Sequence, residues 1–432
     1  MKRKTIKKLL ITLSTIIVLI LTIGYFGLNY LQAKLESSLT GCQLESSNFY
    51  EVLDFEYVNN WIIVKAKVDG SDKEYPFWFD TGAQTVLMDS LLNEIGENNY
   101  KRFSFGNKQD TSQNAFNNAL VSLKELELGG VKFRDIGSIS AKNSKWGMLN
   151  CISAYGIIGY NLIQTCVFQI DFDKQQITLT DNVEKLENYE EIQWVNYKPS
   201  KTQETPILPA TFNDSIKIDL FFDTGSSGGI TLSSEKLYRS LLQQFPNQTA
   251  EYISRPSLLI RGEKNEIGES FLFKASNFSF INNTSEEMII NVSNTPERDF
   301  TGIIGNRYLK NFNITLDYRN RRIGFIPKRN LKEPIDSTFG ITYKPLRNKF
   351  VVSSIYSGYE PELSGIMPGD EIYSINGIRI DELDSDIFCK FYRGEYIFKN
   401  KEDSVLYIEI TKGDSIIAYR FNKKNIFLGR DN

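Results

Sequence analysis

Two aspartates in identical tripeptides are the residues of this sequence best suited to acid–base chemistry. The tripeptide Asp-Thr-Gly occurs at 80–82 and again at 223–225, and an apolar run precedes each copy. Each copy is followed after about 80 residues by Ile-Ile-Gly, at 157–159 and 303–305. A single copy predicts only a tight turn, since Asp caps turns and Gly accepts positive φ. Two copies in the same context predict a pair of carboxylates that would share one proton if they meet.

The absence of histidine narrows the chemistry further. With no imidazole in the chain, Ser-His-Asp and Cys-His catalytic units and histidine-dependent zinc sites are excluded. Asp171, Asp173, Asp181 and the cluster at 381–386 lack the spacing of a calcium loop, which favours a solvated surface. We therefore expect neither a metal nor a cofactor. The net charge of −3 also gives no reason to expect a nucleic-acid partner.

The elements around the two motifs form an internal repeat. The Asp-Thr-Gly copies are 143 residues apart and the Ile-Ile-Gly copies 146, and the pattern continues from 168–172 to 314–318. Short apolar or alternating runs predict strands at 61–68, 77–79, 121–128, 167–170 and 177–180. We therefore expect two tandem copies of a mostly β unit, at 51–181 and 216–327. Residues 182–215 would connect the two units and begin the second.

These motifs resemble those of the pepsin and retropepsin aspartic proteases, over residues 51–328. The resemblance implies two lobes, a pair of acid-protease β barrels, each contributing one Asp-Thr-Gly loop to a shared cleft. The catalytic pair would be Asp80 and Asp223, and the supporting residues would be Thr81, Gly82, Ala83, Thr224, Gly225 and Ser226. The threonines would cross-brace the loops, and the glycines would allow close approach of backbone and carboxylate. Because both copies lie in one chain, a monomer suffices for the site, and the substrate would be a peptide or protein.

The two copies differ at the residue that follows the glycine. Ser226 carries a hydroxyl that can donate to its neighbouring carboxylate, and Ala83 does not. We therefore predict that Asp223 ionises more readily than Asp80. Polar stretches at 103–118 and 255–269 lie where the family folds a hairpin flap over bound peptide, although both also fit ordinary surface loops.

A third unit follows, in residues 328–432, after a linker. The segment 364–377, with Pro-Gly-Asp and Asn-Gly turns around an apolar strand, resembles the signature of PDZ domains of bacterial envelope proteases. The resemblance covers residues 339–427 and implies that a C-terminal peptide adds as a strand. By position, Lys349, Phe350 and Val351 would lie in the peptide-binding region. The alternative is a small β domain that only packs against the protease.

The N-terminus predicts a membrane anchor. Residues 1–8 are basic, and residues 9–31 carry no charge and are long enough for a helix to span the hydrocarbon core. The basic segment would remain in the cytoplasm, and residues 32–50 would link the anchor to a catalytic part outside it. A cleaved signal peptide and lipidation at Cys42 are the alternatives. Cys151 and Cys166 would either pair in an oxidising compartment or remain buried thiols.

These observations predict a membrane-anchored aspartic endopeptidase that hydrolyses peptide bonds with a water activated by two aspartates. The PDZ-like unit would bind substrate or partner peptides. The alternative is an inactive scaffold that uses the cleft and the PDZ-like unit for recruitment. Both Asp-Thr-Gly copies are intact, which favours activity.

Overall fold

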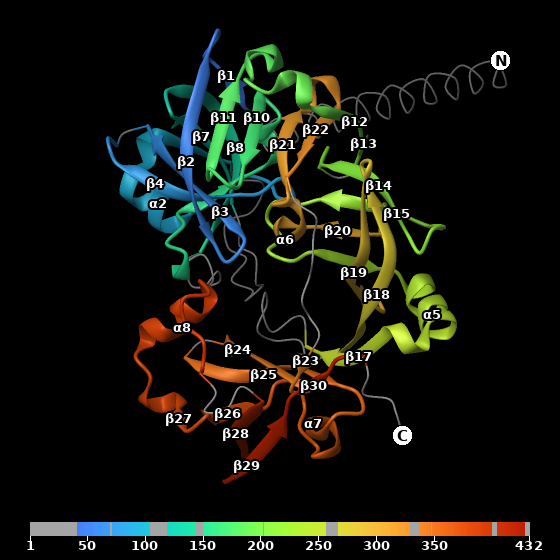
Figure 1. The fold of residues 1–432 in the computed structure, drawn as a ribbon. Coiled ribbons are helices and arrows are strands. Elements are labelled where there is room, and N and C mark those ends of the chain that lie inside the picture. The colour runs from blue at the N-terminus through green and yellow to red at the C-terminus, as the bar shows by residue number, and fades with distance from the viewer. Residues whose placement is uncertain are drawn as a thin grey trace, which may run out of the picture.

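The chain builds two β lobes and a smaller C-terminal β domain (Figure 1). The computed structural model describes residues 41–69, 71–103, 119–142, 150–201, 203–255, 267–328, 337–346, 348–399 and 404–427. The predicted cytoplasmic segment at 1–8 and anchor at 9–31 lie outside these residues, as do residues 32–40 of the predicted linker at 32–50. None of the helices within the described ranges is long and apolar enough to cross a membrane.

Lobe 1 forms a barrel in the first third of the chain. Its strands are β2 (Tyr50–Val58), β3 (Trp61–Val68), β4 (Glu74–Phe79), β5 (Val86–Met88), β6 (Tyr100–Phe103), β7 (Leu120–Leu128), β8 (Val131–Ala141) and β9 (Gly156–Ile158). They pair in the order β2-β3-β4-β9-β5-β8-β7-β6, and an additional β3–β7 pairing closes the sheet. Two-residue turns join β2 to β3 and β7 to β8, and all four turn residues have positive φ. Such turns match the twist of the strands they connect, and Gly129 and Gly130 accept the positive φ that this turn requires.

Lobe 2 repeats this arrangement. Its strands are β14 (Pro206–Phe212), β15 (Ile216–Phe222), β16 (Ile230–Ser233), β17 (Thr249–Ser254), β18 (Gly268–Phe280), β19 (Asn283–Ser293) and β20 (Gly302–Ile304), with helix α5 (Glu235–Gln244) after β16. The strand before each Asp-Thr-Gly pairs in parallel with the Ile-Ile-Gly strand, as β4–β9 and as β15–β20. The parallel pairs β5–β8 and β16–β19 also correspond. The predicted internal repeat is therefore a repeat of strand pairing. The chain is mostly β with two six-stranded barrels, β3-β4-β9-β5-β8-β7 closed by the β3–β7 pairing and β14-β15-β20-β16-β19-β18 closed by the β14–β18 pairing.

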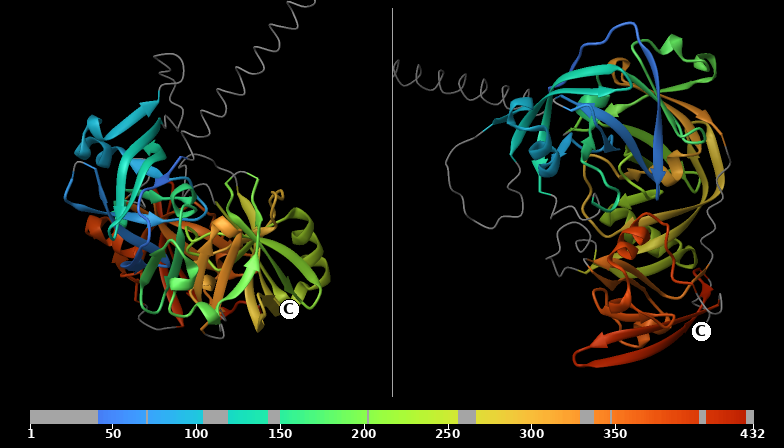
Figure 2. Two further views of the ribbon diagram at one scale, coloured as in Figure 1. Left: turned by 90° about the horizontal axis from the view of Figure 1, so that it is seen from above. Right: turned by 90° about the vertical axis from the view of Figure 1, so that its left-hand side faces the viewer.

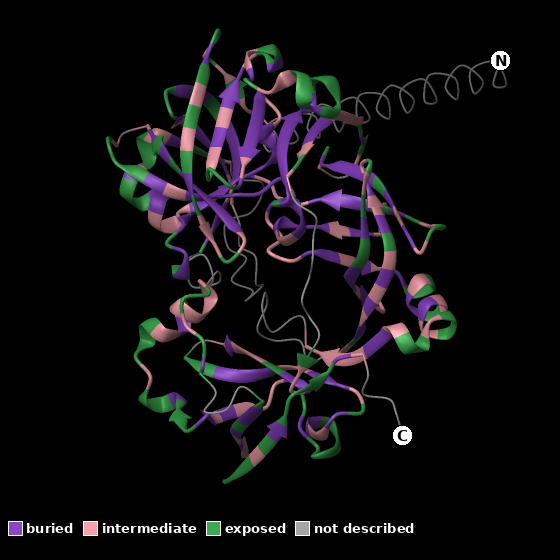
Figure 3. Ribbon diagram, viewed as in Figure 1, coloured by how far each residue is buried: buried purple, intermediate pink, exposed green. Residues whose placement is uncertain are grey.

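A further group of strands joins the two lobes. It consists of β10 (Val167–Asp171), β11 (Gln176–Thr180), β12 (Gln193–Asn196), β21 (Phe312–Asp317) and β22 (Arg322–Pro327), and it continues into β2. At its centre β10 and β21 pair antiparallel, with Phe168 opposite Leu316 and Ile170 opposite Ile314. The two matching sequence segments thus lie side by side. One apolar core runs through both lobes (Figure 3), and it includes Phe79, Phe168, Phe222 and Phe325.

The C-terminal domain has a separate core. Its main elements are β24 (Ile341–Leu346), β25 (Lys349–Tyr356), α7 (Glu360–Leu363), β26 (Glu371–Ile375), α8 (Ser385–Tyr392), β28 (Val405–Lys412) and β29 (Ser415–Asn422). Phe350, Val352, Ile372 and Ile408 are buried at its centre. A two-residue turn at 413–414 joins β28 to β29. The domain lies on the opposite side of the lobes from the strands that join them (Figures 1 and 2).

The C-terminal domain is attached to both lobes. Residues 354–356 of β25 pair antiparallel with residues 252–254 of β17, so the sheet of lobe 2 continues into the domain. On the other side, a disulfide joins Cys151 of lobe 1 to Cys389 of α8. Both predictions for Cys151, a bond to Cys166 and a free thiol, are wrong. Cys166 is a free thiol packed in the common core, where burial raises its pKa.

Candidate active site

The Ile-Ile-Gly strands fix the start of both aspartate loops. The N–H of Asp80 donates to the carbonyl of Ile158 at 3.0 Å, and the N–H of Asp223 donates to that of Ile304 at 3.1 Å. Each aspartate therefore continues the parallel pairing of the buried strand before it. Asp80 is 8% exposed and Asp223 is half-buried. The downstream tripeptide positions the upstream carboxylate in both lobes.

The two threonines connect the loops reciprocally. The N–H of Thr81 donates to Oγ1 of Thr224, and the N–H of Thr224 donates to Oγ1 of Thr81, both at 3.0 Å. Each hydroxyl also donates across the lobe boundary, from Thr81 to the carbonyl of Phe222 at 3.0 Å and from Thr224 to that of Phe79 at 3.2 Å. Both threonines are fully buried. Since a buried donor without a partner is costly, these four hydrogen bonds hold the two loops in one relative position.

The glycines bring each loop against the opposite carboxylate. A Cβ added to Gly82 would lie 2.7 Å from Oδ1 of Asp223, and one added to Gly225 would lie 2.2 Å from Oδ2 of Asp80. Each glycine N–H donates to the aspartate of its own loop, at 2.7 Å for Gly82 and 2.9 Å for Gly225. A side chain at either position would occupy the space that the opposite carboxylate fills.

Burial and mutual proximity perturb the two aspartates unequally. Burial and the nearby charge of Asp223 raise the pKa of Asp80 well above its usual value. Burial also raises the pKa of Asp223, but hydrogen bonds from the N–H groups of Gly225 and Ser226 and from the Asp80 carboxyl oppose that rise. The pKa of Asp80 is therefore raised the more strongly of the two, which is the direction that the sequence predicts, and the backbone N–H of Ser226 is among the groups that oppose the rise at Asp223.

Further polar residues support the loops, and the motifs did not reveal them. The carbonyl of Thr81 accepts from the hydroxyl of Thr205 at 2.9 Å, and the carbonyl of Thr224 accepts from Nδ2 of Asn306 at 2.6 Å. In lobe 1, the hydroxyl of Thr85 donates to Oδ1 of Asn161 at 2.7 Å. These four supporting residues, Thr85, Asn161, Thr205 and Asn306, are fully buried. The signal available in the sequence was an asparagine one or two positions after each Ile-Ile-Gly.

The predicted flaps begin as hairpins. β6 and β7 pair from Tyr100–Leu123 to Phe103–Leu120, and β17 and β18 pair from Thr249–Phe273 to Ser254–Gly268. These strands form the arms of the two stretches that the sequence singles out at 103–118 and 255–269. Most of each stretch, including its centre, lies outside the described residues.

The predicted peptide-binding residues of the C-terminal domain require a correction. Lys349, Phe350 and Val351 lie at the start of β25, where Phe350 is fully buried in the core and Val351 is 5% exposed. β24 covers one edge of β25, and β26 and β17 cover the other. No peptide can add to β25, because its neighbours already use both edges. Among the described strands, β24 has its outer edge unpaired, and α8 contacts this strand.

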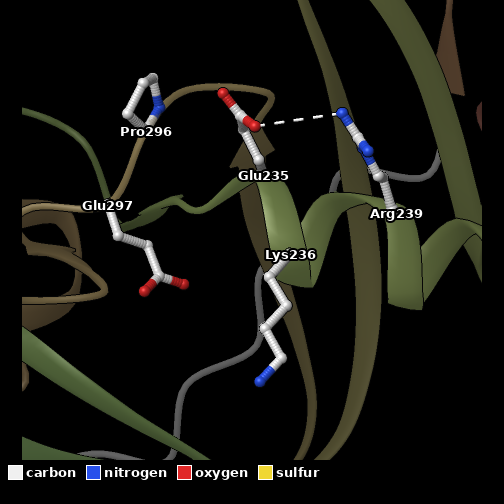
Figure 4. Close-up of a pocket in the computed structure, with 5 residues that line it drawn as sticks. All are labelled: Glu235, Lys236, Arg239, Pro296 and Glu297. Atoms are coloured by element: carbon white, nitrogen blue, oxygen red, sulfur yellow. Dashed lines mark ion pairs between the residues drawn. The ribbon is translucent and has the colours of Figure 1, made fainter.

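Other charged groups are engaged in ion pairs. Asp171 pairs with Lys328, Asp181 with Lys185 and Asp381 with Arg379. Within the described ranges, no three metal-ligating side chains gather. A surface pocket of about 600 Å³ lies at the start of α5 (Figure 4), lined by Glu235, Lys236, Arg239, Pro296 and Glu297. It contains none of the predicted site residues, and the aspartate loops remain the candidate active site.

Comparison with known proteins adds little to this geometry. No family model matches the chain, and no curated protein matches it. Among solved structures, the chain is similar to the crystal structure of basic 7S globulin from soybean, at 10% sequence identity and a TM-score of 0.42. The match covers 65% of this chain and 95% of the globulin chain. A similarity at this level assigns neither a family nor an activity, so a functional proposal must rest on the two aspartate loops.

Proposed function

We propose that this chain is an aspartic endopeptidase with Asp80 and Asp223 as its catalytic pair. The observation that carries the proposal is the reciprocal bonding of Thr81 and Thr224, which holds the two carboxyls against each other. Two adjacent, buried carboxyls retain one proton between them, and this gives one general acid and one general base at the same place. That combination suits hydrolysis of an amide by water.

The proposed reaction uses each carboxyl in turn. The Asp223 carboxylate takes a proton from a water molecule, whose oxygen attacks the scissile carbonyl carbon. Asp80 gives its proton to the carbonyl oxygen, and a tetrahedral diol forms. The diol then collapses, the C–N bond breaks, Asp223 gives its proton to the leaving nitrogen, and Asp80 recovers a proton from a diol hydroxyl. The pair ends as it began, with one shared proton.

The C-terminal domain would bind peptides in the PDZ manner, through the unpaired edge of β24. Strand addition needs free backbone groups beside a pocket for side chains, and β24 runs next to α8. The carbonyl of Pro345 already accepts from the hydroxyl of Tyr392 at 2.8 Å, so a peptide would add along residues 341–344. Tyr343 of β24 and Phe391 of α8 have ring centroids 6.0 Å apart, so aromatic rings pack between this strand and the helix. A peptide with a free C-terminal carboxylate should bind there more tightly than its amide.

The proposed location is the outer side of a membrane. It depends on the uncharged segment 9–31 and on the basic residues before it, which favour a cytoplasmic N-terminus. The disulfide between Cys151 and Cys389 fits an oxidising compartment. Protease protection of the full chain in sealed vesicles would test this orientation, and accessibility of the catalytic part from the cytoplasmic side would contradict it.

The second candidate, an inactive peptide-binding scaffold, keeps the same cleft without the chemistry. Both aspartates and both supporting threonines are present and bonded, and this favours the enzyme. Full-length protein in detergent, incubated with a diverse peptide pool across acidic to neutral pH, should give new N-termini. A statine-type transition-state analogue should block the cleavage.

Matched variants decide between the two candidates. Asp80→Asn and Asp223→Asn should each lower kcat by at least about 1,000-fold, since either change removes one half of the acid–base pair. Asp214→Asn is the control, because this residue is exposed in the β14–β15 turn of lobe 2 and has a positive φ of 62°, which asparagine accepts. Cleavage that persists in the double variant Asp80→Asn/Asp223→Asn would refute the enzyme proposal.

A further inference from the structure

The turn between β2 and β3 touches all three parts of the molecule. Asn59 and Asn60 form this two-residue turn, with φ of 46° and 66°. It belongs to lobe 1, yet Asn60 contacts lobe 2 and Asn59 contacts the C-terminal domain. The β2–β3 hairpin can form without these contacts with lobe 2 and the C-terminal domain, so they suggest a second role for the turn.

The contact with lobe 2 leads directly to a catalytic loop. Nδ2 of Asn306 donates to the carbonyl of Asn60 at 2.8 Å and to the carbonyl of Thr224 at 2.6 Å. Thr224 is the residue after Asp223, and Asn306 is fully buried one residue after Ile-Ile-Gly. The hydroxyl of Tyr57 adds a bond to Oδ1 of Asn60 at 3.1 Å. Both protons of the Asn306 amide are therefore used, one on the turn and one on the catalytic loop.

The contact with the C-terminal domain is reinforced covalently. Nδ2 of Asn59 donates to the carbonyl of Tyr392, at the end of α8, at 2.7 Å. The guanidinium of Arg393 donates to the carbonyl of Cys151 at 3.1 Å, and Cys151 itself is bonded to Cys389. The end of α8 is thus held against lobe 1 at the position where it meets the turn.

We propose that Asn306 is a positioning residue for the Asp223 loop, and that the C-terminal domain sets its position through the Asn59–Asn60 turn. The proposal rests on the proposed protease function. The path runs from Tyr392 through the turn to Asn306 and then to the carbonyl of Thr224. Displacement of the turn would move the side-chain amide of Asn306. This amide cannot shift without loss of a hydrogen bond, because its two acceptors, the carbonyls of Asn60 and Thr224, lie on opposite sides of the lobe boundary. The C-terminal domain then contributes to the chemical step as well as to peptide binding.

A double-mutant cycle in the full-length protein tests this path. Asn306→Leu removes both donors at similar volume and should lower kcat about 10-fold or more, with KM changed less than about threefold. Asn59→Gly removes only the contact with Tyr392, since glycine accepts the left-handed turn, and should lower kcat about threefold. If the two residues act in one path, the double variant should be no slower than Asn306→Leu alone. Cys389→Ser should behave like Asn59→Gly.

The control and the contrary outcomes are specific. Asn282→Gly changes an asparagine with a positive φ of 56° in the β18–β19 turn of lobe 2, and it should leave kcat unchanged. Effects of Asn59→Gly and Asn306→Leu that multiply in the double variant would overturn the coupling, as would a change confined to KM. In either case the protease function would stand, provided that the wild type cleaves and Asp80→Asn does not. A wild type that cleaves no peptide would overturn both proposals.

Discussion

Lobe 1 and lobe 2 present their aspartates with the same backbone pairing but stabilise the loops differently. In lobe 1, side chains do this, because Thr85 bonds Asn161 and its hydroxyl accepts the N–H of Gly159 at 3.1 Å. In lobe 2, a backbone group takes the place of the Thr85 hydroxyl, since the N–H of Gly305 donates to the carbonyl of Gly229 at 2.9 Å, and the side chain of Asn306 supports the carbonyl of Thr224 instead. The difference teaches that the repeat specifies where the carboxyls lie and leaves open which groups hold them there.

The glycines that face the carboxyls should show the largest effect. Gly225→Ala and Gly82→Ala should each lower kcat/KM by about 100-fold or more, because the added Cβ displaces the opposite aspartate. Gly225→Ala should be the worse of the two, since its Cβ would lie 2.2 Å from Asp80, compared with 2.7 Å from Asp223 for Gly82→Ala. Steady-state kinetics on both variants measures the difference. Equal, small losses would mean that the loops can separate.

The threonines should behave alike in the two lobes. Thr81→Val and Thr224→Val each remove one acceptor and one donor from the buried loop contact. Each leaves buried groups unpaired, so the free energy of unfolding should fall by about 2–4 kcal/mol. Denaturant titration measures it, and the double variant should lose less than the two losses added together, since both residues belong to one network. A large difference between the two single variants in the free energy of unfolding would contradict the symmetry of the hydrogen bonds between Thr81 and Thr224.

Thr85 tests the part that is not symmetric. Thr85→Val removes the hydroxyl that bonds Asn161 and Gly159, and it should lower the free energy of unfolding by about 1–3 kcal/mol. The corresponding position of lobe 2 is Gly228, whose loop is held through backbone groups, and Gly228→Ala should cost less than about 1 kcal/mol because a Cβ there lies 3.6 Å from its nearest neighbour. Thermal or denaturant unfolding of both variants gives the comparison. A larger loss in lobe 2 would reverse it.

The pH dependence of stability should give the smallest effect. Because the folded-state pKa of both aspartates is raised, the protonated pair stabilises the fold below about pH 4, and this contribution is lost as the pH rises through the folded-state values. Asp80→Asn removes the more strongly perturbed group. Its melting temperature should therefore exceed that of the wild type at neutral pH, and the gap should close toward pH 4. Asp223→Asn should gain less, and the opposite order would reassign the shared proton.

The sequence predicted those features that depend on neighbouring residues or that occur twice in the chain. The two Asp-Thr-Gly copies predicted the loops, and apolar alternation located strands such as β3 and β7 close to their observed bounds. The lobe connection was less accessible, because polar residues at 182–215 include β12, which joins the strands shared by both lobes. Local patterns predict strands and turns, but they do not say which edge a neighbour will cover.

Contacts between domains could not be predicted for the same reason. Cys389 lies 238 residues from Cys151, in a different domain, and nothing in the spacing of four cysteines selects that pair. Phe350 was assigned to a peptide-binding region by its position in the motif, but the edges of β25 are covered by β24, β26 and a strand of lobe 2. The role of Asn306 could not be predicted, because its two acceptors, the carbonyls of Asn60 and Thr224, belong to different lobes.

The attachment of the C-terminal domain at two places has a mechanical consequence. The domain is fixed to lobe 2 through β17 and β25, and to lobe 1 through Cys151 and Cys389. The domain therefore bridges the two lobes, and any hinge motion that separates them must bend the domain or break the three residue pairs between β17 and β25. Substrate entry would then favour flexible chain segments, which can enter without separation of the lobes, over folded domains, which require the lobes to move apart.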